Sequence, residues 1–281
     1  MEKVISQENL AFIKETIKHI SEKLKFDNYK QGLWLAFGSF VINRNEVGSD
    51  LDLIAINDYF EKDTKIVDSF KSIPIHFTGI NMKILQDDGE SRLYGSYFSG
   101  KIINPHIFLY SNHILKEEAL SHAGKFIAPL AGFLGGMIKK DGFTASQITA
   151  LVFIAYLSTD PSFDSYFLNY FVSPNFNNIW IALCESTTEM LKVSKSIKES
   201  NNKLYFVDKF RDYKSFHEER MKISARHWSY GAVCHGGDRQ FQDSIFTKAK
   251  EKMNRIDPTG NKYRSMVRFL KEKSKLPDIY I

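Results

Sequence analysis

The stretch LWLAFGSFVINRNEVGSDLDLIAI, residues 33–56, decides the fold. An apolar run at 33–37 predicts a buried strand, and a second apolar run at the end of the stretch carries Asp50 and Asp52. Side chains alternate across a strand, so the two carboxylates share one face while the leucines beside them point into the core. The stretch therefore predicts two neighbouring strands, with paired carboxylates at one end of the second.

Paired carboxylates on an apolar strand need a compensating partner, because like charges repel and aspartate forms strands poorly. A divalent cation is the usual partner, since Mg²⁺ is held by one or two carboxylates together with substrate phosphate oxygens. Gly38 lets the backbone approach a phosphate closely, and Ser39 adds a hydroxyl and an N–H group. A phosphate-binding turn ten residues before a metal-binding pair predicts nucleoside triphosphate chemistry.

This pattern of strand, Gly-Ser, ten residues, Asp-Leu-Asp and strand resembles the polymerase-beta-like nucleotidyltransferase superfamily over about residues 30–110. The resemblance implies transfer of a nucleoside monophosphate from an NTP to an acceptor. It implies that Asp50 and Asp52 hold Mg²⁺ or Mn²⁺, and that Gly38 and Ser39 hold the terminal phosphates. It also implies an α+β fold, in which a small mixed-sheet module precedes a helical domain that selects the acceptor.

A third strand is expected at 72–80, where the chain departs from the pattern that it resembles. The superfamily has a third carboxylate on this strand, and the matching position here holds His76. A neutral imidazole binds Mn²⁺ or Zn²⁺ and can act as a base near neutral pH, but it suits Mg²⁺ poorly. Asp87, Asp88 and Glu90 follow closely and could supply the missing acid from a loop.

Helical periodicity dominates the remaining sequence. An amphipathic helix is expected at 6–25, and the polar segment 57–70 is also expected to be helical. Further helices are expected at 114–138, 145–158, 162–172, 176–199, 204–227, 238–255 and 261–274. The chain is therefore expected to contain a catalytic domain, 1–112, and a helical acceptor-binding domain, 113–281. Lys101, near the end of the catalytic domain, is a candidate ligand for the triphosphate.

Charge is distributed unevenly along the chain. Residues 191–281 contain 21 Lys and Arg against 11 Asp and Glu, whereas residues 1–190 contain 17 and 22. A basic C-terminal third favours a polyanionic acceptor such as RNA, with tRNA as one candidate. Two alternatives stay open: a transferase acting on a small molecule or a protein side chain, and a degenerate member that binds a nucleotide or partner without turnover. His76 motivates the second alternative.

Nothing in the sequence favours a membrane protein. The longest stretch without a polar side chain, 126–138, has thirteen residues including a proline, which is too short to span a bilayer. The first residues lack an apolar signal core, so a cytoplasmic protein is expected. Cys184 and Cys234 match neither a metal-ligand spacing nor a disulfide framework.

Overall fold

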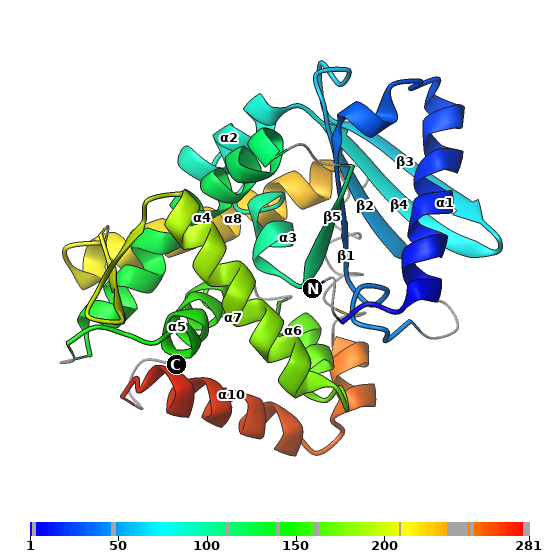
Figure 1. The fold of residues 1–281 in the computed structure, drawn as a ribbon. Helices are drawn as coiled ribbons and strands as arrows, with labels where there is room; N and C mark the ends of the chain where they lie inside the picture. The colour runs from blue at the N-terminus through cyan, green and yellow to red at the C-terminus, as the bar shows by residue number, and fades with distance from the viewer. Residues whose placement is uncertain are drawn as a thin grey trace.

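The computed structural model describes residues 1–281 except 2–3, 46–48, 111–112, 139–140, 160–162, 208, 235–246, 248–249 and 278–281. The fold is mixed α+β, as expected: a five-stranded sheet lies on one side of the molecule, and helices cover it (Figure 1). One helix covers one face of the sheet, and the other face is turned toward the remaining helices (Figure 1).

The sheet has the strand order β3-β4-β2-β1-β5 and contains one parallel pair, β2 with β4. The other neighbours run antiparallel. The bounds of its strands are β1 Leu33–Phe37, β2 Leu51–Ile56, β3 Thr64–Phe70, β4 Ile73–Ile80 and β5 His106–Leu109. The strands expected at 33–37 and 72–80 are therefore confirmed. The strand expected to carry Asp50 and Asp52 is present as β2, but it begins at Leu51, so Asp52 lies on it and Asp50 immediately precedes it.

The helix expected at 57–70 is wrong, because residues 64–70 form the edge strand β3. Strand β3 pairs with β4 through a tight turn at Lys71 and Ser72, whose φ angles are 51° and 65°. Two positive φ angles in a row are typical of two-residue hairpins. An edge strand leaves much of its surface in water, and Val67 is 75% exposed. The polar composition that suggested a helix therefore reflects an edge position.

Helix α1, Gln7–Leu24, covers one face of the sheet and confirms the amphipathic helix expected at 6–25. The Ser6 side chain caps it by accepting a hydrogen bond from the Asn9 N–H group. The inward stripe of Ile13, Ile17 and Ile20 is fully buried and joins the core formed with the sheet. Burial of this stripe holds the helix against the strands.

Helices on the other side of the sheet include four that match expectation closely: α4 His113–Gly136, α5 Ala145–Leu157, α6 Phe163–Phe171 and α10 Asn261–Ser274. The remaining helical segments are η1 Tyr29–Gln31, α2 Met82–Glu90, α3 Ser99–Ile103, α7 Phe176–Val193 and α8 Tyr213–Cys234. Residues 250–256 are also helical. The helix expected at 238–255 lies mostly outside the described residues, and only its last part can be compared.

The helices expected at 176–199 and 204–227 have wrong bounds. A β-hairpin interrupts them, formed by β6 Ile197–Ser200 and β7 Lys203–Phe206. Its turn residues Asn201 and Asn202 have φ angles of 51° and 58°. Asparagine tolerates this conformation better than most residues, so the Asn-Asn pair favours a two-residue turn over a continuous helix.

The main hydrophobic core extends from the sheet face opposite α1 into the helices, including Leu35 and Ile54 from strands and Phe126 and Phe153 from helices. The expected boundary at 112/113 lies at residues 111–112, outside the described part, and the division into two domains stays a prediction. Among the described helices, none combines the length and apolar character that crossing a membrane requires.

Candidate active site

Three polar side chains converge where β2 and β4 begin. Asp50 immediately precedes β2, Asp52 is its second residue, and His76 lies on β4. The parallel register pairs Asp52 directly with His76. One ligand atom from each residue lies within 4.8 Å of the others, and in the described part of the chain no further group of three His, Cys, Asp or Glu side chains is gathered this closely.

The cluster is open to solvent on one side. His76 Nδ1 lies 3.1 Å from Asp50 Oδ2 and 3.8 Å from Asp52 Oδ1. The side chains of His76 and Asp50 are 46% and 47% exposed, whereas that of Asp52 is 31% exposed. A ligand can therefore reach all three groups from solvent, while the buried residues Leu51 and Leu53 fix the strand beneath them.

The two aspartates have opposite electrostatic surroundings. Partial burial raises the pKa of Asp52 to about 6, and the neighbouring charge of Asp50 acts in the same direction. The hydrogen bond with His76 lowers the pKa of Asp50. The site therefore concentrates negative charge that a bound cation would stabilise.

The donor set fits a divalent cation. Two carboxylates and one imidazole are ligands that Mn²⁺ and Zn²⁺ accept readily, whereas Mg²⁺ prefers oxygen alone. The expected metal ligands Asp50 and Asp52 do lie together, and His76 lies beside them. Whether the cluster binds a metal stays a prediction.

The Gly38-Ser39 turn lies against the same carboxylates. Strand β1 pairs Phe37 with Asp52, and Gly38 follows with a φ angle of +87°. A Cβ atom at Gly38 would lie 3.4 Å from Asp52 Oδ2. The Arg44 N–H group donates a hydrogen bond of 2.8 Å to the Ser39 carbonyl oxygen, which closes the loop. The residues expected to bind phosphates are thus brought next to the residues expected to bind metal.

The first turn of α1 fixes this loop from outside. The Asn9 side-chain amide donates to the Phe40 carbonyl oxygen at 2.9 Å and to the Asn43 and Asn45 side-chain oxygens at 3.1 and 3.0 Å. The Asn43 amide donates in turn to the Val4 carbonyl oxygen. The loop between β1 and β2 is therefore held by residues more than thirty positions earlier in the chain.

Lys101 also belongs to the site. It lies in α3, with its Nζ atom 5.2 Å from the centre of the Phe37 ring and 5.6 Å from that of Tyr97. Its positive charge counteracts the rise in the pKa of Asp52. Gly38, Ser39 and Lys101 therefore lie in the same region as Asp50, Asp52 and His76.

The three acids considered as substitutes for a third carboxylate are engaged elsewhere. The Asp88 carboxylate is buried and accepts hydrogen bonds from the N–H groups of Ser96, Phe98 and Ser99 at 2.9, 3.0 and 2.7 Å. Asp87 pairs with Lys83. Glu90 Oε1 lies 2.8 Å from the Nζ atom of Lys125 and 3.2 Å from His122 Nδ1. None of them joins the cluster of Asp50, Asp52 and His76.

Two residues that sequence reasoning did not assign to the carboxylate site interact with it electrostatically. Lys252, in the helical segment 250–256, contributes positive charge that lowers the pKa of both Asp50 and Asp52. Tyr170 in α6 is buried, which raises its pKa, and the negative charge of Asp52 adds to that rise. No local signal could have identified either residue, because more than a hundred positions separate each of them from the motif.

A second group of aromatic and charged side chains lies between β3 and α8. Lys65 Nζ lies 4.6 Å from the centre of the Tyr230 ring and 5.4 Å from that of Tyr97. The Tyr230 hydroxyl donates a 2.8 Å hydrogen bond to Asp63 Oδ2. Tyr97 therefore has a lysine from β3 and a lysine from α3 near its ring, which connects this group to Lys101.

The arrangement offers acidic ligands, a glycine turn and nearby lysines, which together suit a substrate that carries phosphate groups and a cation. The geometry is the basis for assigning chemistry to this chain. No protein-family model matches it, and comparison with curated proteins gives no match either.

Proposed function

We propose that this protein is a metal-dependent nucleotidyltransferase, which moves a nucleoside monophosphate from an NTP to an acceptor hydroxyl or phosphate. The observation that carries the proposal is the convergence of Asp50, Asp52 and His76 beside the turn at Gly38. Phosphoryl transfer depends mainly on positioning and on stabilising negative charge. A cluster that gathers cation ligands next to a turn free of side-chain bulk supports both requirements.

Each residue has a defined role in this proposal. Asp50 and Asp52 would hold Mn²⁺ or Mg²⁺, and the cation would stabilise charge on the phosphates and favour ionisation of the acceptor. Gly38, Ser39 and Lys101 would bind the terminal phosphates. His76 would orient Asp50 through the 3.1 Å hydrogen bond.

The reaction balances without a further reactant. An acceptor oxygen forms a bond to the α-phosphorus, and the bond from that phosphorus to the β-phosphate oxygen breaks. Pyrophosphate leaves with the electron pair of the broken bond. The proton of an acceptor hydroxyl passes to the imidazole of His76, which lies on the open side of the site.

A second candidate function is nucleotide or partner binding without turnover. It is favoured by the cluster itself, which contains two carboxylates and an imidazole instead of three carboxylates. Loss of one anionic ligand weakens the binding of a hard cation. In this case the protein would bind a nucleotide at the same residues but release it unchanged.

Labelling from NTPs tests the proposal directly. The protein is incubated with each α-³²P-labelled NTP, Mg²⁺ or Mn²⁺, and either total RNA or a cell lysate, and the labelled product is identified. We expect label in an acceptor. The rate of labelling should fall on the order of 10³-fold in the Asp52→Asn variant, because this substitution removes a carboxylate that would hold the cation.

The exposed Asp58 provides a matched control, and Asp58→Asn should retain wild-type labelling. Full activity of Asp52→Asn would contradict the assignment of the site. NTP binding without labelling of any acceptor would favour the non-catalytic candidate.

A further inference from the structure

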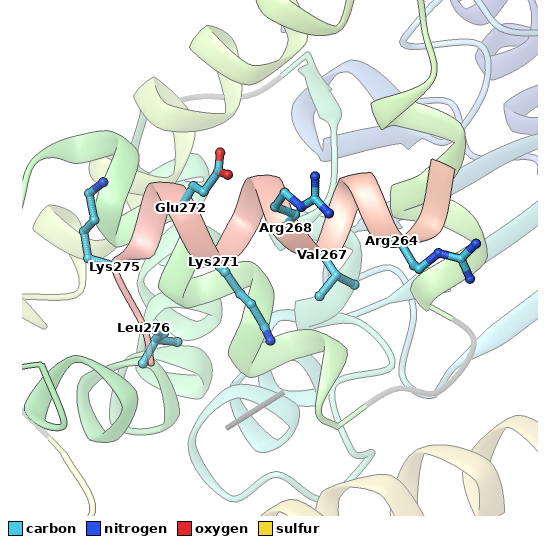
Figure 2. Close-up of a pocket in the computed structure, with 7 residues that line it drawn as sticks. All are labelled: Arg264, Val267, Arg268, Lys271, Glu272, Lys275 and Leu276. Carbon is cyan, nitrogen blue, oxygen red and sulfur yellow. The ribbon is translucent and has the colours of Figure 1, made fainter. Parts of the chain in front are cut away.

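The outward side of α10 carries a row of four cations, which we call the α10 basic face. Arg264, Arg268 and Lys271 recur at intervals of four and three residues, which places them on one side of the helix, and Lys275 follows as the left-handed C-cap with a φ angle of 64°. The opposite side of α10 buries Met266 and Leu270 in the core. The helix is thus anchored by its apolar side and presents the cations outward (Figure 2).

These cations line an open pocket of about 600 Å³, together with Val267, Glu272 and Leu276 (Figure 2). Arg268 and Lys275 are exposed. Glu272 is the single acid among the described lining residues. The pocket therefore has a surplus of positive charge that suits an anionic ligand.

A short connection links the α10 basic face to the carboxylate cluster. Residues 250–256 precede α10, and between them Asp257 Oδ2 accepts a 2.7 Å hydrogen bond from the Tyr263 N–H group. Lys252, on the first of these helices, acts electrostatically on Asp50 and Asp52.

An exposed aromatic ring lies on the same path. Lys252 Nζ is 5.0 Å from the centre of the Tyr166 ring, which is 42% exposed. Cations and one accessible ring thus extend from α10 toward the site. Positive charge combined with exposed aromatic rings is the usual composition of surfaces that bind single-stranded nucleic acid.

We propose that the α10 basic face binds the phosphate backbone of a single-stranded RNA acceptor, whose terminal nucleotide reaches the carboxylates past Tyr166 and Lys252. The proposal rests on the proposed function and names its acceptor. The three cations on the helix lie about 4.5–6 Å apart along its axis and extend over about 10 Å, and Lys275 continues the row beyond the end of the helix. A small-molecule acceptor is too short to contact all the cations of this row.

Binding of RNA can be measured without metal or NTP, and therefore independently of catalysis. The probe is a fluorescently labelled single-stranded 12-mer of RNA, and its anisotropy is followed between 50 and 200 mM KCl. Four phosphate contacts should give a slope of log affinity against log salt near −2.8, which is about a 50-fold loss of affinity over this range.

Charge reversal should remove part of this binding. The double variant Arg268→Glu with Lys275→Glu should bind at least about 10-fold more weakly at 50 mM KCl, with a slope smaller by about 1.4. The control changes two exposed lysines elsewhere, Lys14→Glu with Lys198→Glu, and alters the net charge equally. The single variant Glu272→Gln should act in the opposite direction and strengthen binding several-fold.

Three results would overturn the proposal: unchanged RNA affinity in the α10 variant, an equal loss in the control variant, or binding to anionic phosphatidylserine vesicles but not to RNA. Equal affinity for the matching DNA 12-mer would support phosphate recognition by the α10 basic face.

Failure of this proposal can be distinguished from failure of the proposed function. Salt-sensitive RNA binding through α10 without transfer of label would contradict the transferase alone. Labelling of a small molecule without RNA binding would contradict the α10 assignment alone.

Discussion

Asp52 and Asp88 both have a raised pKa, but the surroundings of the two carboxylates differ. Burial raises the pKa of both Asp52 and Asp88. Asp88 is enclosed and accepts hydrogen bonds from three backbone N–H groups, which organise the start of α3. Asp52 is partly open to solvent, lies beside the like charge of Asp50, and is opposed by the charges of Lys101 and Lys252.

The comparison separates a structural carboxylate from a candidate functional one. A raised pKa by itself indicates burial, which both kinds of residue share. The difference lies in whether the carboxylate oxygen atoms already accept hydrogen bonds from groups within the protein. Asp88 has its partners within the fold, whereas the cluster at Asp52 concentrates negative charge on a surface that a substrate can reach.

The largest contrast should come from removing each carboxylate. Asp88→Ala leaves three buried N–H groups without an acceptor, at a cost of about 1–3 kcal/mol each, so the free energy of unfolding should fall by at least about 3 kcal/mol. Asp52→Ala should abolish transfer and leave the free energy of unfolding unchanged or higher, because it relieves repulsion with Asp50. Urea denaturation and the labelling assay measure the two effects. Severe unfolding of Asp52→Ala would contradict the assignment of Asp52 as a functional residue and Asp88 as a structural one.

Burial also shifts the pKa of a basic side chain, His106, in the opposite direction. His106 is buried, which lowers its pKa to about 4, and its Nδ1 atom is 2.8 Å from the Asn104 carbonyl oxygen. An unfolded histidine has a pKa near 6.5, so the unfolded chain binds the proton first as the pH falls. Stability should therefore fall between about pH 6.5 and pH 4, by up to about 3 kcal/mol, and then level off.

The variant His106→Gln should remove this part of the pH dependence while keeping a hydrogen-bond donor for Asn104. Denaturation of both proteins at several pH values measures the difference. Parallel curves for wild type and variant over this range would show that His106 does not titrate as its burial requires.

The smallest effect concerns His76, which is half-exposed and can be exchanged without burying a charge. If His76 binds the cation directly instead of orienting Asp50, wild-type activity should be higher with Mn²⁺ than with Mg²⁺. His76→Asp should then raise Mg²⁺-dependent turnover by about 10-fold, within the usual range for changes around a metal. Turnover in each metal is read beside the melting temperature, because a third carboxylate should destabilise the metal-free protein. Equal use of both metals, with no gain from aspartate, would remove His76 from the ligand set.

Much of the catalytic region could be predicted because its information is local. The apolar runs on both sides of Gly38, the alternation around Asp50 and Asp52, and the stripe in α1 each specify an element from neighbouring residues. Their coming together at one end of the sheet follows from the pairing of adjacent strands. The metal and the reaction stay predictions.

Other features depended on contacts between distant residues. Strand β3 is polar because it lies at an edge, and only its pairing with β4 makes it a strand. Lys252 acts electrostatically on Asp52 although some two hundred residues separate the two in the sequence. The turn at Asn201 was a local signal for the hairpin, and the helical periodicity on both sides concealed it.

The hydrogen bonds of Asn9 have a consequence for the order of folding. They join the first turn of α1 to the loop after β1 across 31 to 36 positions of sequence. Closing a loop of this length costs conformational entropy, so these contacts should form after the local turns of the helix and the strand. Secondary structure should therefore appear in refolding before the loop acquires its final shape. A ligand is then expected to bind at Gly38 and Asp52 only after α1 has packed against the sheet.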